Sequence, residues 1–489
     1  MESTFYERLS AQDRSFLHFE DATTHMHLGG LALFEAGPLT TPAGGIDIDR
    51  IRRQIAGRLA FVPRYRQRLG WIPVFNQAVW VDDDHFNLAY HVRHTALPRP
   101  GDDTQLKLLT ARIMSQQLDR GKPLWELWVI EGLARDRFAL LVKTHHAIAD
   151  GISAFDLFAA LVSPSPDDVI DEPQPWTPRP APSGARLLAE GLARQVAAPL
   201  TMAQRLFAIA SDPAGVGAST RESMRALLDI AGAGASLPPA TPLNQPISAH
   251  RIFDWLTLDL AEVKAVKTRL GGTVNDVALA SVAGGLHHFL LGRGVDVRDL
   301  ELRVVVPVSV RTEDERGQVS NRASGWLLDL PVGEPDPARR LAAIALETSK
   351  RKAIHQELGP EVLGRVAEYV VPGILGLGVR LLSHLHPYNL IVTNVSGPQV
   401  PLYLLGARLL AGFPQAPLFE NQGLGIALFS YCGALGFGFN ADLQVMPDLD
   451  AFAAAVGRGF AELAHAAAGT ARRAAQGDVP QEPRARRRS

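Results

Sequence analysis

The sequence predicts an α/β protein made of two halves with similar elements. At 489 residues the chain is too long for one hydrophobic core of ordinary size. Apolar runs typical of strands alternate with stretches of helical periodicity on both sides of a proline-rich region. We therefore expect an N-terminal domain at 1–162, a connector with crossover helices at 163–246, a C-terminal domain at 247–475 and a basic, disordered tail at 476–489.

The N-terminal half has the signals of an α+β domain. Ser10 can cap a helix, with Asp13 at the capping-box position. Hydrophobic spacing then predicts strands at 25–34, 124–133 and 138–144, a hairpin at 71–80, and helices at 48–59, 103–118 and 152–161. The strands at 124–133 and 138–144 are expected to pair.

The C-terminal half follows two expected connector helices, at 185–210 and 220–231. Strands are predicted at 251–258, 302–310, 325–330 and 390–395, and helices at 260–270, 274–291, 338–354, 361–371 and 449–468. A hairpin of 424–431 and 435–440 is expected to turn at Cys432-Gly433-Ala434.

Composition excludes several classes of function. The 49 basic and 51 acidic side chains nearly balance, so no global field would attract nucleic acid. The single cysteine, Cys432, excludes an internal disulfide and favours a reducing, cytoplasmic compartment. No signal peptide is apparent, and no stretch reaches the roughly 20 apolar residues of a membrane-spanning helix.

One motif stands at the end of the expected strand 138–144. It begins His145-His146 and ends Asp150-Gly151. Because neighbouring strand side chains point to opposite faces, the two histidines cannot both face one cavity if the strand persists that far, so one is a candidate base and the other belongs to the wall of the cavity. Gly151 eases a turn that brings Asp150 back, either near the imidazole or into a salt bridge that fixes the loop.

The chemistry that fits this motif is general-base catalysis on an incoming hydroxyl. Adjacent histidines on a strand diverge and no cysteine cluster assists, so we expect no metal. There is no Gly-x-Ser-x-Gly elbow and Cys432 lacks a nearby partner, so a covalent acyl-enzyme is not expected. A positioned base contributes about 10²–10⁴-fold, and positioning and oxyanion stabilisation supply the remainder.

Two further groups of residues have both structural and functional interpretations. Asn275 and Asp276 lie in the first turn of an expected helix, where they can cap backbone donors or face a cavity. His25 and His27 share a strand face and can line the same cavity or serve a structural role.

The motif matches the His-His-x-x-x-Asp-Gly signature shared by coenzyme A-dependent acyltransferases and peptide-synthetase condensation domains. Other segments resemble more narrowly the bacterial wax ester synthase/diacylglycerol acyltransferase family, and the similarity extends over about residues 9 to 470. These segments are Leu9-Ser10-Ala11-Gln12-Asp13, Met26-His27-Leu28-Gly29, Pro123-Leu124-Trp125-Glu126, Asn275-Asp276-Val277, Pro307-Val308-Ser309-Val310-Arg311 and Thr393-Asn394-Val395-Ser396-Gly397-Pro398. Leu97-Pro98-Arg99-Pro100-Gly101 and Leu118-Asp119-Arg120 resemble the actinobacterial triacylglycerol synthases within it; Ser396 departs from the commoner proline.

This resemblance implies two chloramphenicol-acetyltransferase-like domains with the active site in a tunnel at their interface. It implies acyl-CoA as co-substrate, no cofactor, and diacylglycerol or a long-chain alcohol as acceptor. By the motif match, His146 is the general base, His145 supports it, Asp150 orients the loop and Gly151 completes the motif. Asn275 and Asp276 match a second family motif, for which we expect a place beside the substrate.

Three hypotheses follow. The leading one is an acyl-CoA-dependent O-acyltransferase, cytoplasmic and peripherally associated with membrane or lipid droplets. The second is a condensation-domain-like enzyme that takes acyl groups from carrier-protein thioesters. The third is a lipid-droplet binding protein without catalytic activity.

Overall fold

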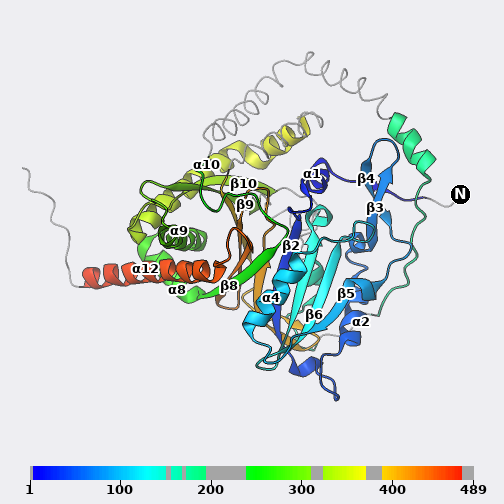
Figure 1. Ribbon diagram of the computed structural model, residues 1–489, viewed down its shortest axis with the longest axis horizontal. Coiled ribbons are helices and arrows are strands. Elements are labelled where there is room, and N and C mark those ends of the chain that lie inside the picture. The colour runs from blue at the N-terminus through cyan, green and yellow to red at the C-terminus, as the bar shows by residue number, and fades with distance from the viewer. Residues whose placement is uncertain are drawn as a thin grey trace, which may run out of the picture.

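The computed structural model describes residues 4–149, 156–167, 172–193, 238–309, 323–369 and 388–475. Within these residues, two six-stranded sheets form two lobes that lie side by side (Figure 1). A smaller sheet adjoins the N-terminal lobe and consists of β1 (Glu7–Arg8), β4 (Gln77–Asp82) and β3 (Gln67–Ile72). The predicted α/β class with two sheet-rich domains is confirmed.

The sheet of the first lobe is covered on both faces. Its spatial order is β12 (Tyr403–Leu404), β13 (Ala407–Gln415), β2 (His27–Glu35), β7 (Arg137–His145), β6 (Trp125–Leu133) and β5 (Val92–Ala96). Leu31 and Leu33 pack toward α4 (Asp103–Met114), which crosses in front of the sheet in Figure 1. The alternate side chains Ala32 and Phe34 pack toward α2 (Ile48–Arg58) and α5 (Asp156–Leu161). The short α3 (Leu88–His91) precedes β5.

The second lobe has helices on its outer side (Figure 1). Its sheet order is β10 (Ala323–Pro331), β9 (Glu301–Ser309), β11 (Leu390–Ser396), β14 (Leu424–Tyr431), β15 (Ala434–Asp442) and β8 (Arg251–Asp259). The helices are α8 (Leu260–Leu270), α9 (Val274–Gly292), α10 (Pro337–Tyr369) and α12 (Leu449–Ala475). Helix α9 is apolar around most of its circumference because it lies in the centre of this lobe's core.

The two lobes interlock through β13. This strand belongs to the stretch expected as the C-terminal domain, yet it pairs antiparallel with β2 of the first sheet, from Leu409 opposite Phe34 to Gln415 opposite Gly29. It also packs closely on β15: a Cβ at Gly438 would lie 1.9 Å from the Pro414 carbonyl oxygen. The backbones of the two lobes are therefore in direct contact.

Local sequence signals account for several element boundaries. The Ser10 hydroxyl accepts from Asp13 N–H at 3.0 Å and so caps α1 (Ala11–Phe19), as predicted. The β14–β15 hairpin turns at Cys432 and Gly433, both with positive φ, which matches the twist of antiparallel strands. The predicted pairing of β6 with β7 is also confirmed.

Some expectations concern residues that the structure does not describe. They include the helix at 220–231, most of that at 185–210, the end of that at 361–371 and the tail at 476–489. Among the helices that the structure describes, none combines the length and apolar character needed to span a membrane.

Candidate active site

The histidine motif lies where the central strand β7 ends. His145 is the last residue of β7 and pairs with His27 of β2. His146 begins a short 3-10 turn, His146–Ala149. The strand thus ends between the two histidines, and their imidazoles make different contacts. Asp150 and Gly151 lie outside the described residues.

His146 is a partly buried imidazole under an aromatic cover. Its ring stacks on Phe16 of α1, with centroids 3.8 Å apart and planes 23° from parallel. Its backbone N–H donates to the Met26 carbonyl at 2.8 Å. Nδ1 is buried and has no hydrogen-bond partner among the described residues. Burial lowers the pKa of His146 to about 4, so the ring is neutral and able to accept a proton at pH 7.

His145 has a different environment. It is 1% exposed, and its Nδ1 accepts a hydrogen bond from the Ala147 N–H at 3.0 Å. Its Nε2 lies 3.5 Å from Oε2 of Glu20, the C-cap residue that follows α1. His145 is thus held between its own turn and a carboxylate, and it is a supporting residue in this geometry.

Glu20 and Arg120 are residues of the site that the sequence did not reveal. Glu20 Oε2 accepts from Nε and Nη2 of Arg120 at 2.9 and 2.6 Å. Its Oε1 lies 3.6 Å from Nε2 of His27. Arg120 ends the segment Leu118-Asp119-Arg120 that carried part of the resemblance, but it lies 100 residues from Glu20, and no signal in a single sequence joins the two.

An apolar cavity of about 320 Å³ lies between the lobes. Its walls come from β2, β7, β13 and α5 of the first lobe and from β11 and β14 of the second, and they include Val142, Phe158, Val395, Phe413 and Phe429. Val142 lies on β7 four residues before His146. The cavity is within the roughly 300–1,000 Å³ typical of small-molecule sites and is lined mainly by apolar side chains.

Asn275 and Asp276 have separate roles. Asp276 completes a capping box with Thr273, and its Oδ1 also accepts from the Thr348 hydroxyl at 2.8 Å. Asn275 accepts at Oδ1 from Asn394 Nδ2 at 3.2 Å. Asn394 precedes the cavity-lining Val395 on β11, but neighbouring strand side chains point to opposite faces, and neither Asn275 nor Asn394 is among the residues that line the apolar cavity.

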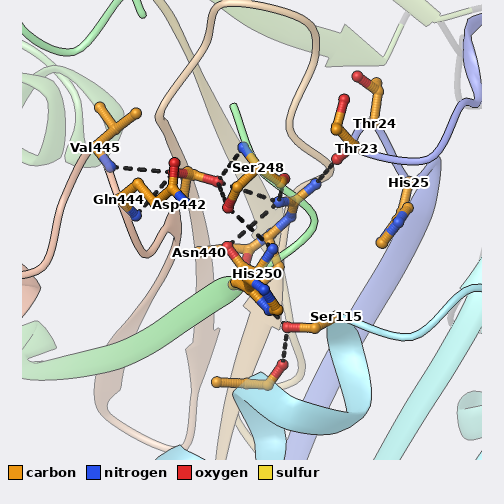
Figure 2. A network of polar contacts seen from close by, with 12 residues as sticks. Thr23, Thr24, His25, Ser115, Ser248, His250, Asn440, Asp442, Gln444 and Val445 are labelled. Carbon is orange, nitrogen blue, oxygen red and sulfur yellow. Dashed lines mark hydrogen bonds and ion pairs between the residues drawn. The ribbon is translucent and has the colours of Figure 1, made fainter. Parts of the chain in front are cut away.

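A polar network joins the lobes beside the loop that follows α1 (Figure 2). Arg251, at the start of β8, donates from its guanidinium to the Thr23 carbonyl and, at 2.6 Å, to the Ser248 carbonyl. Its backbone N–H donates to the Ser115 hydroxyl at 2.8 Å. Asp442 lies 3.6 Å from the guanidinium and accepts twice from Ser248. Figure 2 shows these groups converging from both lobes.

Comparison with known proteins identifies the family. The model of the wax ester synthase/diacylglycerol acyltransferase catalytic domain matches residues 9–278, and that of the family's C-terminal domain matches residues 319–464. The chain belongs to the wax ester synthase/diacylglycerol acyltransferase family. It is therefore an acyltransferase, and the resemblance seen in the sequence is confirmed.

Relatives and solved structures agree with this family. A Mycobacterium tuberculosis protein named a probable diacylglycerol O-acyltransferase is 35% identical over 445 residues, covering 90% of this chain and 92% of the relative. Another M. tuberculosis protein with that name is 33% identical over 449 residues, covering 89% and 94%. The structure of the wax ester synthase/diacylglycerol acyltransferase of Marinobacter aquaeolei matches with a TM-score of 0.68 at 25% identity, covering 94% of this chain and all of that one.

A condensation domain shares the fold alone. The first condensation domain of the CDA synthetase matches with a TM-score of 0.54 at 16% identity, covering 96% of this chain and 98% of that one. Together with the two sheet-rich lobes, these matches confirm the expected pair of chloramphenicol-acetyltransferase-like domains.

Proposed function

We propose that this acyltransferase moves a long-chain acyl group from acyl-CoA to diacylglycerol or a long-chain alcohol, with His146 as general base. The observation that carries the proposal is the imidazole of His146, kept neutral by burial at the end of β7, the strand that also lines the interlobe cavity. An apolar cavity suits an acyl chain, and a neutral imidazole suits the removal of a hydroxyl proton.

The reaction needs one base and no covalent acyl-enzyme. As the acceptor oxygen attacks the thioester carbonyl, its proton passes to His146, and the carbonyl oxygen becomes a tetrahedral oxyanion. The intermediate collapses, the carbon–sulfur bond breaks, and the imidazolium returns the proton to the leaving CoA thiolate. The products are the ester and free CoA, and the imidazole is neutral again.

His145, Asp150 and Gly151 support this base in the proposal. His145 holds the Ala147 N–H, and Asp150 orients the loop that Gly151 completes. We further propose that Asn275 lies beside the bound substrate, as its match to the family's second motif implies, whereas Asp276 fixes the start of α9. The enzyme uses acyl-CoA as co-substrate without a bound cofactor, and it acts on lipid at a membrane or lipid-droplet surface from the cytoplasm.

The test is CoA release from palmitoyl-CoA with diolein and hexadecanol offered together, followed by separation of the neutral lipids. We expect triacylglycerol as the main product because both M. tuberculosis relatives have names that specify diacylglycerol as acceptor. His146→Ala should lose turnover while remaining folded. Full activity of that variant would refute the role of His146, and turnover with carrier-protein thioesters alone would refute acyl-CoA as donor.

The absence of a cofactor has a separate test. Dialysis of the purified enzyme against a chelator should leave the rate of CoA release unchanged. A loss that added metal restores would contradict the cofactor-free reaction.

A further inference from the structure

A buried carboxylate lies behind the histidine motif and has no part in the proton transfer proposed above. The side chain of Glu20 is 3% exposed, and the residue caps the C-terminal end of helix α1. An isolated charge at such a place would be costly, so its partners must offset the lost solvation. Arg120 does so with two hydrogen bonds to one oxygen, and it also donates to the Leu17 carbonyl of α1 at 3.1 Å.

The charge of Glu20 is preserved in this environment. Burial alone would raise the pKa of this carboxyl, but the contacts with His145 and Arg120 outweigh burial and hold the pKa below its usual range. His27, near the other oxygen, is neutral because burial lowers its pKa well below the usual value. Arg120 is therefore the counter-charge, and His145 presents a ring nitrogen to an ionised acceptor.

The two nitrogens of His145 have opposite tasks. Nδ1 accepts from the Ala147 N–H, so it carries no proton. The ring proton must then be on Nε2, the nitrogen that lies 3.5 Å from Glu20. At this distance the contact is electrostatic and is not a hydrogen bond. The negative carboxylate favours the tautomer whose N–H faces it, because it can accept a proton donor and cannot donate to a bare nitrogen.

The tautomer matters because the turn depends on it. Two consecutive backbone N–H groups of the turn donate hydrogen bonds. The His146 N–H donates to the Met26 carbonyl, and the Ala147 N–H donates to Nδ1 of His145. If the proton moved to Nδ1, the Ala147 N–H would face a donor in a buried place and the turn would have to shift. A shift of about 1 Å at a reacting group costs about a hundredfold in rate.

We propose that Glu20 is a positioning residue for acyl transfer, which fixes the proton of His145 on Nε2 so that Nδ1 can hold the turn carrying His146. The proposal rests on the function proposed for His146. Arg120 keeps the carboxylate ionised and in place, and neither residue touches substrate.

Glu20→Gln tests this directly. Glutamine offers both a donor and an acceptor to Nε2, so it no longer selects one tautomer. We expect kcat for CoA release to fall about tenfold to a hundredfold, with KM for palmitoyl-CoA unchanged. The matched control is Glu462→Gln, which changes a carboxylate that contacts His288 at 2.6 Å and Arg340 at 3.8 Å in the other lobe; its kcat should not change.

A double-mutant cycle separates positioning from general stability. His145→Asn places an amide oxygen near the position of Nδ1, where it can accept from Ala147 without any choice of tautomer. Adding Glu20→Gln to that variant should therefore lower kcat less than twofold further. An equal loss of kcat in both backgrounds, or full activity of Glu20→Gln alone, would overturn the proposal.

The design also guards against misfolding and against failure of the function itself. If Glu20→Gln does not fold, it is combined with Arg120→Gln, so that the carboxylate and its counter-charge are removed together; the same coupling to His145→Asn is expected, and additive losses would overturn the proposal. Absence of CoA release by the unmodified enzyme with any acyl-CoA would refute the proposed function. Release by the unmodified enzyme without the coupling would refute only the role of Glu20.

Discussion

Phe16 is expected to determine how low the pH can fall before the enzyme loses activity, because its ring covers one face of His146. The pKa of His146, lowered from 6.5 to about 4 by burial, corresponds to about 3 kcal/mol against charging the ring. Phe16→Ala would open one of the two ring faces to water and recover part of that energy. We expect the acid limb of kcat/KM to lie near pH 4 in the unmodified enzyme and about one pH unit higher in the variant.

The assay is CoA release across pH 3.5–8 in micelles of an uncharged detergent. The quantity kcat/KM is appropriate because it reports the free enzyme, whose contacts are those described. The control is Phe16→Leu, which keeps an apolar side chain over His146, so the acid limb of kcat/KM should stay near pH 4. An acid limb at 6.5 in the unmodified enzyme, or no change in Phe16→Ala, would refute the reasoning.

Stability must be followed in the same experiment. The unfolded chain binds a proton at this imidazole near pH 6.5, whereas the folded protein binds it near pH 4. Stability therefore falls by up to about 3 kcal/mol as pH drops through that window. Removing the Phe16 ring costs a further 3–5 kcal/mol, roughly, so far-UV circular dichroism must show that each variant is folded where its rate is measured.

Three further predictions concern the joint between the lobes and the cavity. Arg251→Leu leaves the carboxylate of Asp442 buried without its cation, so chemical denaturation should show a loss of about 3–5 kcal/mol; a change below 1 kcal/mol would contradict this. Ala32→Leu fills the cavity from β2, so kcat/KM should fall more for palmitoyl-CoA than for octanoyl-CoA, and an equal loss for both would show that the acyl chain lies elsewhere. Gly438→Ala forces a Cβ to 1.9 Å from a carbonyl oxygen of β13 and should lower the free energy of unfolding by about 3 kcal/mol or more. In the control Gly457→Ala the nearest atom to the new Cβ is 3.8 Å away, so this change should stabilise α12 by about 0.5–1 kcal/mol.

The sequence predicted those parts of the fold that depend on neighbours in the chain. The cap at Ser10, the start of α9 at Thr273 and the hairpin at Cys432 each need only a few adjacent residues, and all are present. The strand repeat also predicted different environments for His145 and His146, although β7 ends at His145 and His146 begins the 3-10 turn. The assignment of His146 as base and His145 as supporting residue came from the motif match and not from local geometry.

Strand β13 could not be predicted in the same way. Pro414 lies inside it, and a proline within an apolar run argues against a strand. Its partner β2 lies almost 400 residues earlier in the chain. The glycines of β15 let the backbone of β13 approach closely, but they form no sequence pattern that identifies β13 as their neighbour. The pairing is a property of the assembled lobes, as is that of Glu20 with Arg120.

The low pKa of His146 raises the question of how so weak a base removes a hydroxyl proton. A base works best when its pKa lies near the working pH, and the pKa of His146 lies below that range. The proton affinity of the ring must therefore rise during the reaction. The oxyanion that forms on the thioester carbonyl is the charge that can raise it, because imidazolium and oxyanion attract each other strongly where water is excluded. Burial then has a catalytic consequence: it disfavours the imidazolium in the resting enzyme and stabilises it only next to the negative charge of the transition state.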